Sequence, residues 1–247
     1  IFIYLHTKVN TVCYMSALST TSSSMFDMIM ELPLFQGVSR KIISEIIEKV
    51  PFHFESYENG EQIISVGDHC NSLIFVMSGK VQIELPFANK RVRILEVVDA
   101  PTVLGYAYLY GQDKKMPYKV SAYGKCGVMR LTKMDYFNIL QKDPIFLLNL
   151  MNMLSRVVQQ SKGSSLSIAR GTIQNRLAQM FQLSMHTGAH DLRLVFRQKD
   201  LCTLLGVQRT SLINALDGMQ AEGIIEYSQM DIVVKDFEKL CSDLKPR

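Results

Sequence analysis

The sequence predicts an α+β fold in which an antiparallel β-roll of the jelly-roll kind is followed by a long helix and then by a winged helix-turn-helix domain. Three observations predict this order. Short apolar segments cut by glycines run from Pro51 to about Thr132, an apolar stripe at helical spacing follows Pro144, and two short helical segments meet at Gly206. At 247 residues the chain is long enough for two small domains, the more common arrangement at this length.

The composition is that of an ordered globular protein, with 47% hydrophobic and 20% charged residues. A net charge of +4 is only mildly basic, so any basic surface for a nucleic acid has to be local. No segment approaches the roughly 18 apolar residues of a membrane span, and no Cys-x-x-Cys pair indicates zinc or an iron–sulfur cluster. We therefore predict a cytoplasmic protein with reduced thiols and no membrane association. The five cysteines are Cys13, Cys70, Cys126, Cys202 and Cys241.

Residues 1–24 are interpreted apart from the rest of the chain. They begin without methionine and end in a Ser/Thr cluster, and their apolar run Ile1–Leu5 is too short for the core of a signal peptide. We interpret them as a disordered leader or a start-site artefact, with Met25 as the expected start.

Residues 25–142 are predicted to form the first domain, a sensor-type roll. A helix begins after Ser39, a candidate N-cap, and ends at Pro51, which cannot continue a helix. Four strand-like segments follow at roughly ten-residue spacing and end at glycine, proline or aspartate, which is typical of an antiparallel roll or barrel. The helix carries apolar residues at Ile42, Ile43, Ile46, Ile47 and Val50, and the strand segments are residues 62–66, 73–77, 81–85 and 92–98.

Residues 143–169 are predicted to form one long helix. Asp143 and Pro144 suit its N-cap and first turn, and Gly163 is a weak point that could act as a hinge. Because the helix is longer than the roll it leaves, its apolar stripe is expected to pair with the same stripe of a second chain in a homodimer. The alternative is a helix that packs wholly on its own roll. The stripe consists of Leu147, Leu150, Met151, Leu154, Val157 and Val158.

Residues 170–247 are predicted to form the second domain. A helix over residues 172–185 and a strand at residues 192–196 precede two short helices that meet at Gly206. Strands at residues 224–227 and 231–234 complete the pattern of helix, tight turn, helix and wing. Cys202 is the small residue that lets the second helix cross closely, and the inward-facing set is Leu201, Leu205, Val207, Leu212 and Ala215.

The second of these short helices carries residue types that read DNA bases. Polar residues face outward near its N-terminus, where helices of this kind enter the major groove. Arg209 suits a bidentate contact to guanine, and Asn214 suits one to adenine. The alternative is a helical hairpin that binds nothing. The predicted DNA-contacting residues are Lys199, Gln208, Arg209, Thr210, Ser211 and Asn214, in a basic cluster that also includes Arg193 and Arg197.

Two segments give a family resemblance. The segment GEQIISVGDHCNSLIFVMSGKV, at residues 60–81, and the segment LLGVQRTSLINAL, at residues 204–216, are similar to the roll and the recognition region of the catabolite-activator (CRP/FNR) superfamily of bacterial transcription regulators. The resemblance spans about residues 34–240. It implies a homodimer that binds palindromic duplex DNA, with RNA polymerase as a candidate partner.

Nucleotide-binding members of this superfamily hold a cyclic nucleotide in a loop that corresponds to residues 104–119. In those members a glutamate follows a glycine, and an arginine and a small hydroxyl residue lie further along the loop. At the corresponding positions, counted from Gly105, this sequence has Tyr106, Met116 and Pro117. Charge-assisted hydrogen bonds contribute roughly 1.5–3 kcal/mol each, so this departure predicts no response to cyclic AMP or cyclic GMP.

Two interpretations of the altered loop remain open. Either the pocket accepts a different, more apolar effector, or the aromatic side chains fill the roll and no ligand exists. Lys114 and Lys115 are interpreted as solvated. Ser161 and Lys162 align with two positions that contact the base in nucleotide-binding members. The candidate pocket residues are Gly105, Tyr106, Tyr108, Met116, Pro117, Tyr118, Ser161 and Lys162.

No motif supports another sensing route or an enzymatic activity. An iron–sulfur member would show a cysteine cluster before the roll, where Cys13 stands alone, and His69 with Cys70 is interpreted as a polar surface pair in a turn. His186, His190 and Asp191 are likewise interpreted as surface residues, because no catalytic motif accompanies them. The sequence therefore predicts no enzyme, no metal and no cofactor.

The predicted recognition helix departs from that of the best-known activator. Of the arginine, glutamate and second arginine that read bases there, Arg209 keeps the first, whereas Thr210 and Asn214 replace the others. Asp217 replaces a basic residue that contacts phosphate. We therefore predict a sequence-specific DNA-binding transcription regulator with a changed target. The alternative is a ligand-sensing or protein-interaction module that has lost DNA binding.

Overall fold

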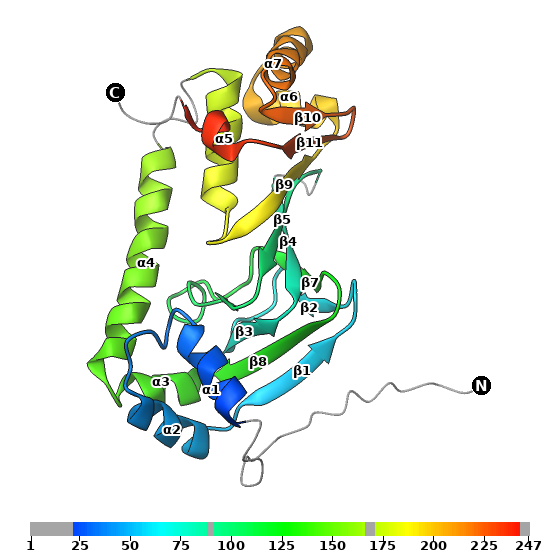
Figure 1. Cartoon of the computed structure of the whole chain (residues 1–247). Helices are drawn as coiled ribbons and strands as arrows, with labels where there is room; N and C mark the ends of the chain where they lie inside the picture. Colours follow the sequence, from blue (N-terminus) through cyan, green and yellow to red (C-terminus); the bar gives the residue numbers. More distant parts are fainter. Residues whose placement is uncertain (1–21, 88–90, 166–170, 243–247) are drawn as a thin grey trace, which may run out of the picture.

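The computed structural model describes residues 22–87, 91–165 and 171–242 (Figure 1). Two helices, α1 (Ser22–Glu31) and α2 (Arg40–Lys49), precede the first strand. The Ser39 side chain accepts the Ile42 amide proton, so the predicted N-cap of α2 is confirmed. Helix α1 begins inside the segment that we interpreted as a leader, and Ile29 on this helix is fully buried in the roll core. Helix α1 therefore begins three residues before Met25.

The roll consists of two antiparallel sheets. The smaller has the strand order β1 (His53–Tyr57), β8 (Cys126–Thr132), β3 (Ser72–Ser78) and β6 (Thr102–Leu104). The roll strands of the larger sheet have the order β5 (Val92–Asp99), β4 (Lys80–Phe87), β7 (Lys119–Ala122) and β2 (Gln62–Ile64). The four predicted strand segments correspond to β2, β3, β4 and β5, and the antiparallel roll is confirmed.

The hairpin of β4 and β5 is longer than the sequence predicts, because β4 continues through Pro86 to Phe87. Proline cannot donate a hydrogen bond to a neighbouring strand and is tolerated where one side of the strand is unpaired. Strand β7 pairs with β4 only at residues 81–84, so Pro86 lies where β4 has β5 alone as its partner. The end of the hairpin thus extends beyond the body of the roll.

The core of the roll also holds the start of the long helix. Short helix α3 (Lys133–Leu140) leads into α4 (Pro144–Ser165), whose first turn is capped by the Asp143 carboxylate accepting the Ile145 amide proton at 2.8 Å. The ring of Phe35 lies 5.6 Å from that of Phe146 on α4 and 5.9 Å from that of Phe75 on β3. These buried aromatic contacts fix the direction in which α4 leaves the roll.

The second domain is a winged helix-turn-helix. Helix α5 (Ile173–Ser184), capped by Thr172, is followed by β9 (Ala189–Val195), α6 (Gln198–Leu205), α7 (Arg209–Ala221), β10 (Ile225–Tyr227), β11 (Asp231–Val234) and α8 (Phe237–Leu240). Its core contains Leu177, Phe181, Leu194, Leu212 and Ile232, each at most 1% exposed. Across residues 22–87, 91–165 and 171–242, no helix is long and apolar enough to cross a membrane.

The two domains share a sheet, which the sequence did not predict. Strand β9 pairs antiparallel with β5 of the roll on one side and with β11 of the wing on the other. The larger sheet therefore runs through seven strands in the order β10-β11-β9-β5-β4-β7-β2 (Figure 1). The hairpin that extends beyond the roll is the element that joins them.

Candidate nucleic-acid interface

The turn between α6 and α7 has a fixed geometry. Gly206 has φ 64° and ψ 38°, in the left-handed region that favours glycine, and the Val207 amide donates to the Cys202 carbonyl at 3.0 Å. Arg176 of α5 donates from Nη1 to the Leu205 carbonyl at 2.5 Å. This arginine satisfies a carbonyl at the end of α6, so helix α5 holds the turn in place.

The inward faces of the two helices bury their apolar side chains. Leu201 and Leu205 on α6 pack with Leu212 on α7, and all three are at most 6% exposed. Cys202, Val207 and Ala215 are half-buried at the edge of the same core. The predicted inward set therefore lies together, and it holds α7 at a fixed crossing angle on α6.

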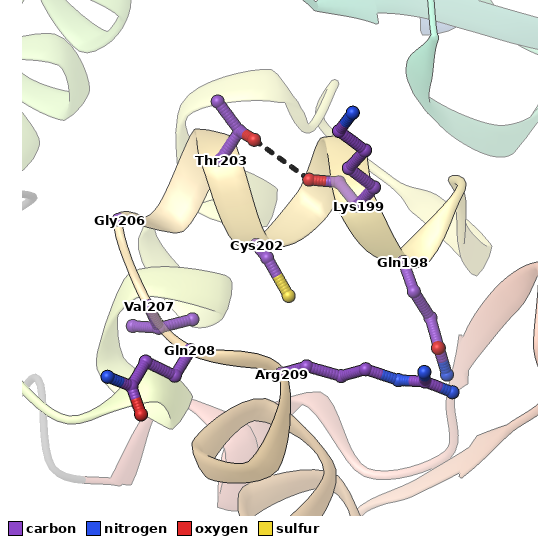
Figure 2. Close-up of a pocket in the computed structure, with 8 residues that line it drawn as sticks. All are labelled: Gln198, Lys199, Cys202, Thr203, Gly206, Val207, Gln208 and Arg209. Carbon is purple, nitrogen blue, oxygen red and sulfur yellow. Dashed lines mark hydrogen bonds between the residues drawn. The ribbon is translucent and has the colours of Figure 1, made fainter.

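The outward face of α7 presents the predicted contact residues. Gln208, Arg209, Thr210, Ser211 and Asn214 are all exposed, as is Lys199 on α6. A groove of about 740 Å³ lies between the two helices, and Figure 2 shows Arg209 extending along it toward Gln198. No side-chain hydrogen bond caps α7, and its first turn contains no acidic residue. The start of α7 therefore suits an anionic partner such as a phosphate.

The residues of the basic cluster differ in whether they form ion pairs within the protein. Within the described part of the chain, Arg197, Lys199 and Arg209 form no ion pair with a carboxylate, whereas Arg193 lies 3.7 Å from Asp231 on the wing. Asp217 on α7 bonds to the hydroxyl of Tyr227, and this hydrogen bond raises the pKa of Tyr227. The negative charge of Asp217 thus points at the wing.

The altered loop lines a cavity between the domains. The cavity measures about 130 Å³ and is lined by the loop, by Arg156 and Val157 of α4, and by residues 183–187 at the end of α5. Of the predicted pocket residues, the lining includes Gly105, Tyr106, Tyr108, Pro117 and Tyr118. Met116 is 3% exposed and lies in the roll core instead. Ser161 and Lys162 lie on α4, but their side chains are outside the part that the structure describes.

Three tyrosines line this cavity. The Tyr118 ring packs edge to face with Tyr108, at 6.1 Å, and with His186 of the second domain, at 5.0 Å. Burial raises the pKa of Tyr106, Tyr108 and Tyr118 above that of a free tyrosine. Lys114 and Lys115 are not among the lining residues, and among the described side chains that line the cavity Arg156 is the one arginine or lysine.

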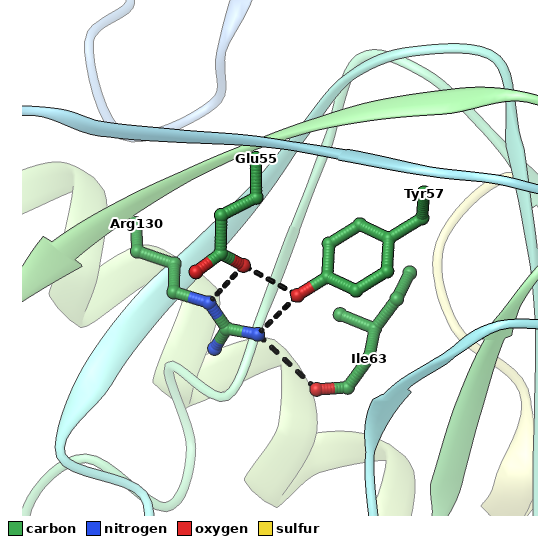
Figure 3. A network of polar contacts seen from close by, with 4 residues as sticks. All are labelled: Glu55, Tyr57, Ile63 and Arg130. Atoms are coloured by element: carbon green, nitrogen blue, oxygen red, sulfur yellow. Dashed lines mark hydrogen bonds and ion pairs between the residues drawn. The ribbon is translucent and has the colours of Figure 1, made fainter. Parts of the chain in front are cut away.

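An arginine elsewhere in the roll is occupied by structural contacts. Arg130 on β8 donates to the Glu55 carboxylate at 2.8 Å and to the Tyr57 hydroxyl at 3.2 Å, both on β1 (Figure 3). It also donates to the Ile63 carbonyl on β2 at 3.2 Å. The guanidinium thus ties the smaller sheet to the larger one and does not line the loop cavity.

Two predictions of surface residues are wrong. Cys70, two residues before β3, is 5% exposed because it points inward, where its thiol contacts the Gly105 carbonyl at 3.3 Å and burial raises its pKa. Its neighbour His69 is exposed. His186 is largely buried, with 19% of its side chain exposed, because it contacts Glu96 of the roll. Among the described residues, no three His, Cys, Asp or Glu side chains lie close enough together to hold a metal ion.

Comparisons with known proteins agree with this architecture. A cyclic nucleotide-binding domain model matches residues 54–143, and a Crp-like helix-turn-helix domain model matches residues 175–242. The cAMP-activated global transcriptional regulator CRP of Haemophilus influenzae is 20% identical over 187 residues, which cover 74% of this chain and 84% of that protein. Regulatory protein YeiL of Escherichia coli O157:H7 is 24% identical over 189 residues, covering 76% and 83%.

A solved structure supports the fold of the roll. The sensor domain of the transcriptional regulator DNR from Pseudomonas aeruginosa matches with a TM-score of 0.50 and 18% identity, covering 57% of this chain and 93% of that one. Roll, long helix and exposed recognition helix together define a helix-turn-helix transcription regulator with a cyclic nucleotide-binding-type domain. The chain belongs to the catabolite-activator (CRP/FNR) superfamily, as its sequence motifs predicted.

Proposed function

We propose that this chain is a sequence-specific transcription regulator that places the start of α7 in the major groove of duplex DNA. The observation that supports this proposal best is the exposed polar row on α7, held over a buried apolar face. Polar side chains that the protein leaves unpaired are available to base edges. Such a partner also implies that the protein acts in the cytoplasm.

The contact residues have distinct roles in this proposal. Arg209 donates two hydrogen bonds to a guanine, and Asn214 pairs with an adenine in the same half-site. Lys199 and Arg197, at the start of α6, neutralise backbone phosphates without reading sequence. Asp217 repels the phosphates on its side of the helix, so non-specific affinity is lower than a basic residue there would give.

We infer that the regulator acts as a homodimer through α4. Leu147, Leu148 and Met151 are between 47% and 56% exposed, whereas Leu150 is buried against its own roll. A helix that packed wholly on its own chain would not leave three adjacent apolar side chains in water. Pairing of two such helices buries this surface and places two copies of α7 in successive major grooves.

We infer also that cyclic AMP and cyclic GMP are not its effectors. Ligand pockets typically measure about 300–1,000 Å³, whereas the loop cavity measures about 130 Å³. The end of α5 occupies one side of that cavity, and Met116 is turned into the roll where an arginine would have to reach a phosphate.

The decisive experiment is selection of binding sites from a random duplex library at about 0.15 M salt, with purified protein and no added effector. We expect an inverted repeat whose half-sites lie about 34 Å, one helical turn, apart. Failure to enrich any site, both alone and with cell extract present, would contradict DNA binding.

The dimer is tested separately by sedimentation. Met151→Glu places a charge in the exposed apolar stripe and is expected to give a monomer with weakened DNA binding. Asn138→Glu, at an exposed position on α3, is the matched control and should remain dimeric. A Met151→Glu protein that sediments as a dimer would contradict the role of α4.

A further inference from the structure

The hairpin of β4 and β5 belongs to both domains. Arg93, Ile94 and Leu95 on β5 pair with Val195, Leu194 and Arg193 on β9, and the pairing resumes at Val97 and Val98. Strands β5 and β9 lie edge to edge, so main-chain hydrogen bonds join the two domains. An inter-domain contact of this kind has one register and therefore one orientation.

The tip of the hairpin completes the core of the winged helix. Val92 and Ile94 of β5 are at most 2% exposed, and they pack in the same cluster as Leu194 and Leu212. Arg91, next to them, lies 3.5 Å from Asp200 in the first turn of α6. The roll thus supplies apolar surface and an ion pair to the domain that carries the recognition helix.

A bulge in β9, where Asp191 and Leu192 lie opposite Glu96 alone, accompanies a buried polar contact. The register shifts between Leu95 and Val97, and Glu96 at the shift is 2% exposed. Its carboxylate accepts the His186 amide proton at 3.1 and 3.3 Å and also contacts Nδ1 of the His186 ring. Separation of the domains would break these contacts between Glu96 and His186.

The orientation fixed in this way leaves the DNA-binding face clear. Figure 1 shows α7 at the end of the molecule opposite α2, with β9 and β5 between it and the body of the roll. The contacts described above that fix this orientation come from the chain's own residues. Regulators that switch need a ligand to favour one orientation of their recognition helices, and here main-chain pairing and Glu96 already favour one.

We propose that strand β5 and the contact between Glu96 and His186 hold the winged helix in the DNA-binding orientation without an effector. The inference rests on the proposed DNA-binding function. The chain is then a constitutive regulator. A contact between its domains favours one orientation of the recognition helix, as a bound ligand does in regulators that switch. Opening of the shared sheet is then the step that turns DNA binding off.

A disulfide across the shared sheet tests whether pairing of β5 with β9 favours or inhibits DNA binding. Arg93 and Val195 are directly opposite each other, and facing residues in antiparallel strands are about 4.5–5.5 Å apart at Cα, within the range of disulfides. The Arg93→Cys/Val195→Cys protein is compared when oxidised and when reduced, with each single variant treated alike. We expect the oxidised protein to bind the selected duplex within about twofold of the reduced one. Loss of binding only on oxidation would show that the shared sheet is an inhibited state.

Removal of the buried contact tests its contribution. Glu96→Ala is expected to weaken DNA binding on the order of tenfold, a typical coupling between sites, and the Arg93/Val195 disulfide should restore it. The control is Glu84→Ala, on the half-exposed side of the same hairpin. If Glu96→Ala is unfolded by circular dichroism, His186→Pro removes both the ring and the amide proton that Glu96 accepts. Wild-type affinity in a folded variant that lacks either side chain would overturn the proposal.

The two proposals fail in different ways. Wild-type protein that binds no duplex with or without cell extract would refute DNA binding itself. Wild-type protein that binds only when extract is present would keep the DNA-binding function and overturn its independence from an effector.

Discussion

Helix α7 corresponds to the DNA-contacting helix of this superfamily, and the loop at residues 105–118 corresponds to its nucleotide-binding loop. The two elements differ in side-chain exposure. On α7 the polar side chains are exposed over a buried apolar face. In the loop, Tyr118 and Met116 are at most 5% exposed, and Tyr106 and Tyr108 line a cavity that residues 183–187 of the second domain also line. A surface that binds a partner keeps polar atoms unpaired, whereas a loop that packs as structure buries its side chains.

The largest expected effect comes from restoring the missing arginine of the loop. Met116→Arg places a charge in the roll core and should lower the free energy of unfolding by about 3–5 kcal/mol, because the charge has no buried partner. Urea denaturation with and without cyclic AMP measures this change. The control is Met134→Arg, since Met134 is 64% exposed. Unchanged stability with a gain of cyclic AMP binding would show that the pocket is intact.

The second largest effect is expected in base-pair discrimination by α7. Arg209→Ala should cost about 1–3 kcal/mol of discrimination at one base pair of each half-site, because a bidentate contact to guanine is lost. Competition between the selected duplex and single-base variants measures it. Arg40→Ala, in α2, is the control for loss of one positive charge. Equal selectivity in the two variants would contradict the assignment of Arg209.

A third effect appears at alkaline pH. Burial raises the pKa of Tyr118 above its ordinary value of 10.0, so the folded state keeps this proton while the unfolded state loses it. Stability should therefore be complete below about pH 10 and fall above it, by about 1.4 kcal/mol per pH unit for each such group. Tyr118→Phe should reduce this slope in urea denaturation between about pH 8 and pH 11. The exposed Tyr123→Phe is the matched control, and equal slopes would contradict the buried state of Tyr118.

The smallest expected effect is that of cyclic AMP on the wild-type protein. Because we infer that the loop cavity does not hold this nucleotide, cyclic AMP should change DNA affinity by less than about twofold. Fluorescence anisotropy of the selected duplex measures this, with the cAMP-activated regulator of Haemophilus influenzae as the positive control. A larger response from this chain would require a nucleotide site other than the loop cavity.

Local features were predictable where the determinant is local. Ser39 and Thr172 each cap a helix that the sequence indicated, and Gly206 adopts the left-handed conformation that a tight turn requires. The two strands of the wing were predicted to within one residue of their observed bounds. Periodicity and capping residues depend on neighbours in the chain, so one sequence is enough to read them.

Features set by distant residues were not predictable. The pairing of β5 with β9 joins segments about 100 residues apart, and neither alternation pattern shows which strand lies beside it. The same holds for Cys70 and His186, whose burial depends on Gly105 and Glu96 rather than on their own neighbours. The exposed row of α7 was found because its signal lies within one helix.

The shared strand also limits how such regulators can be recombined. Cutting the chain near Gly171 would leave one edge of β9 unpaired and would remove Val92 and Ile94 from the core of the winged helix. An unpaired strand edge beside exposed apolar side chains promotes aggregation. A chimera that transplants this winged helix onto another roll should therefore carry residues 80–99 with it, so that the unit of exchange includes a hairpin far from the helices in sequence.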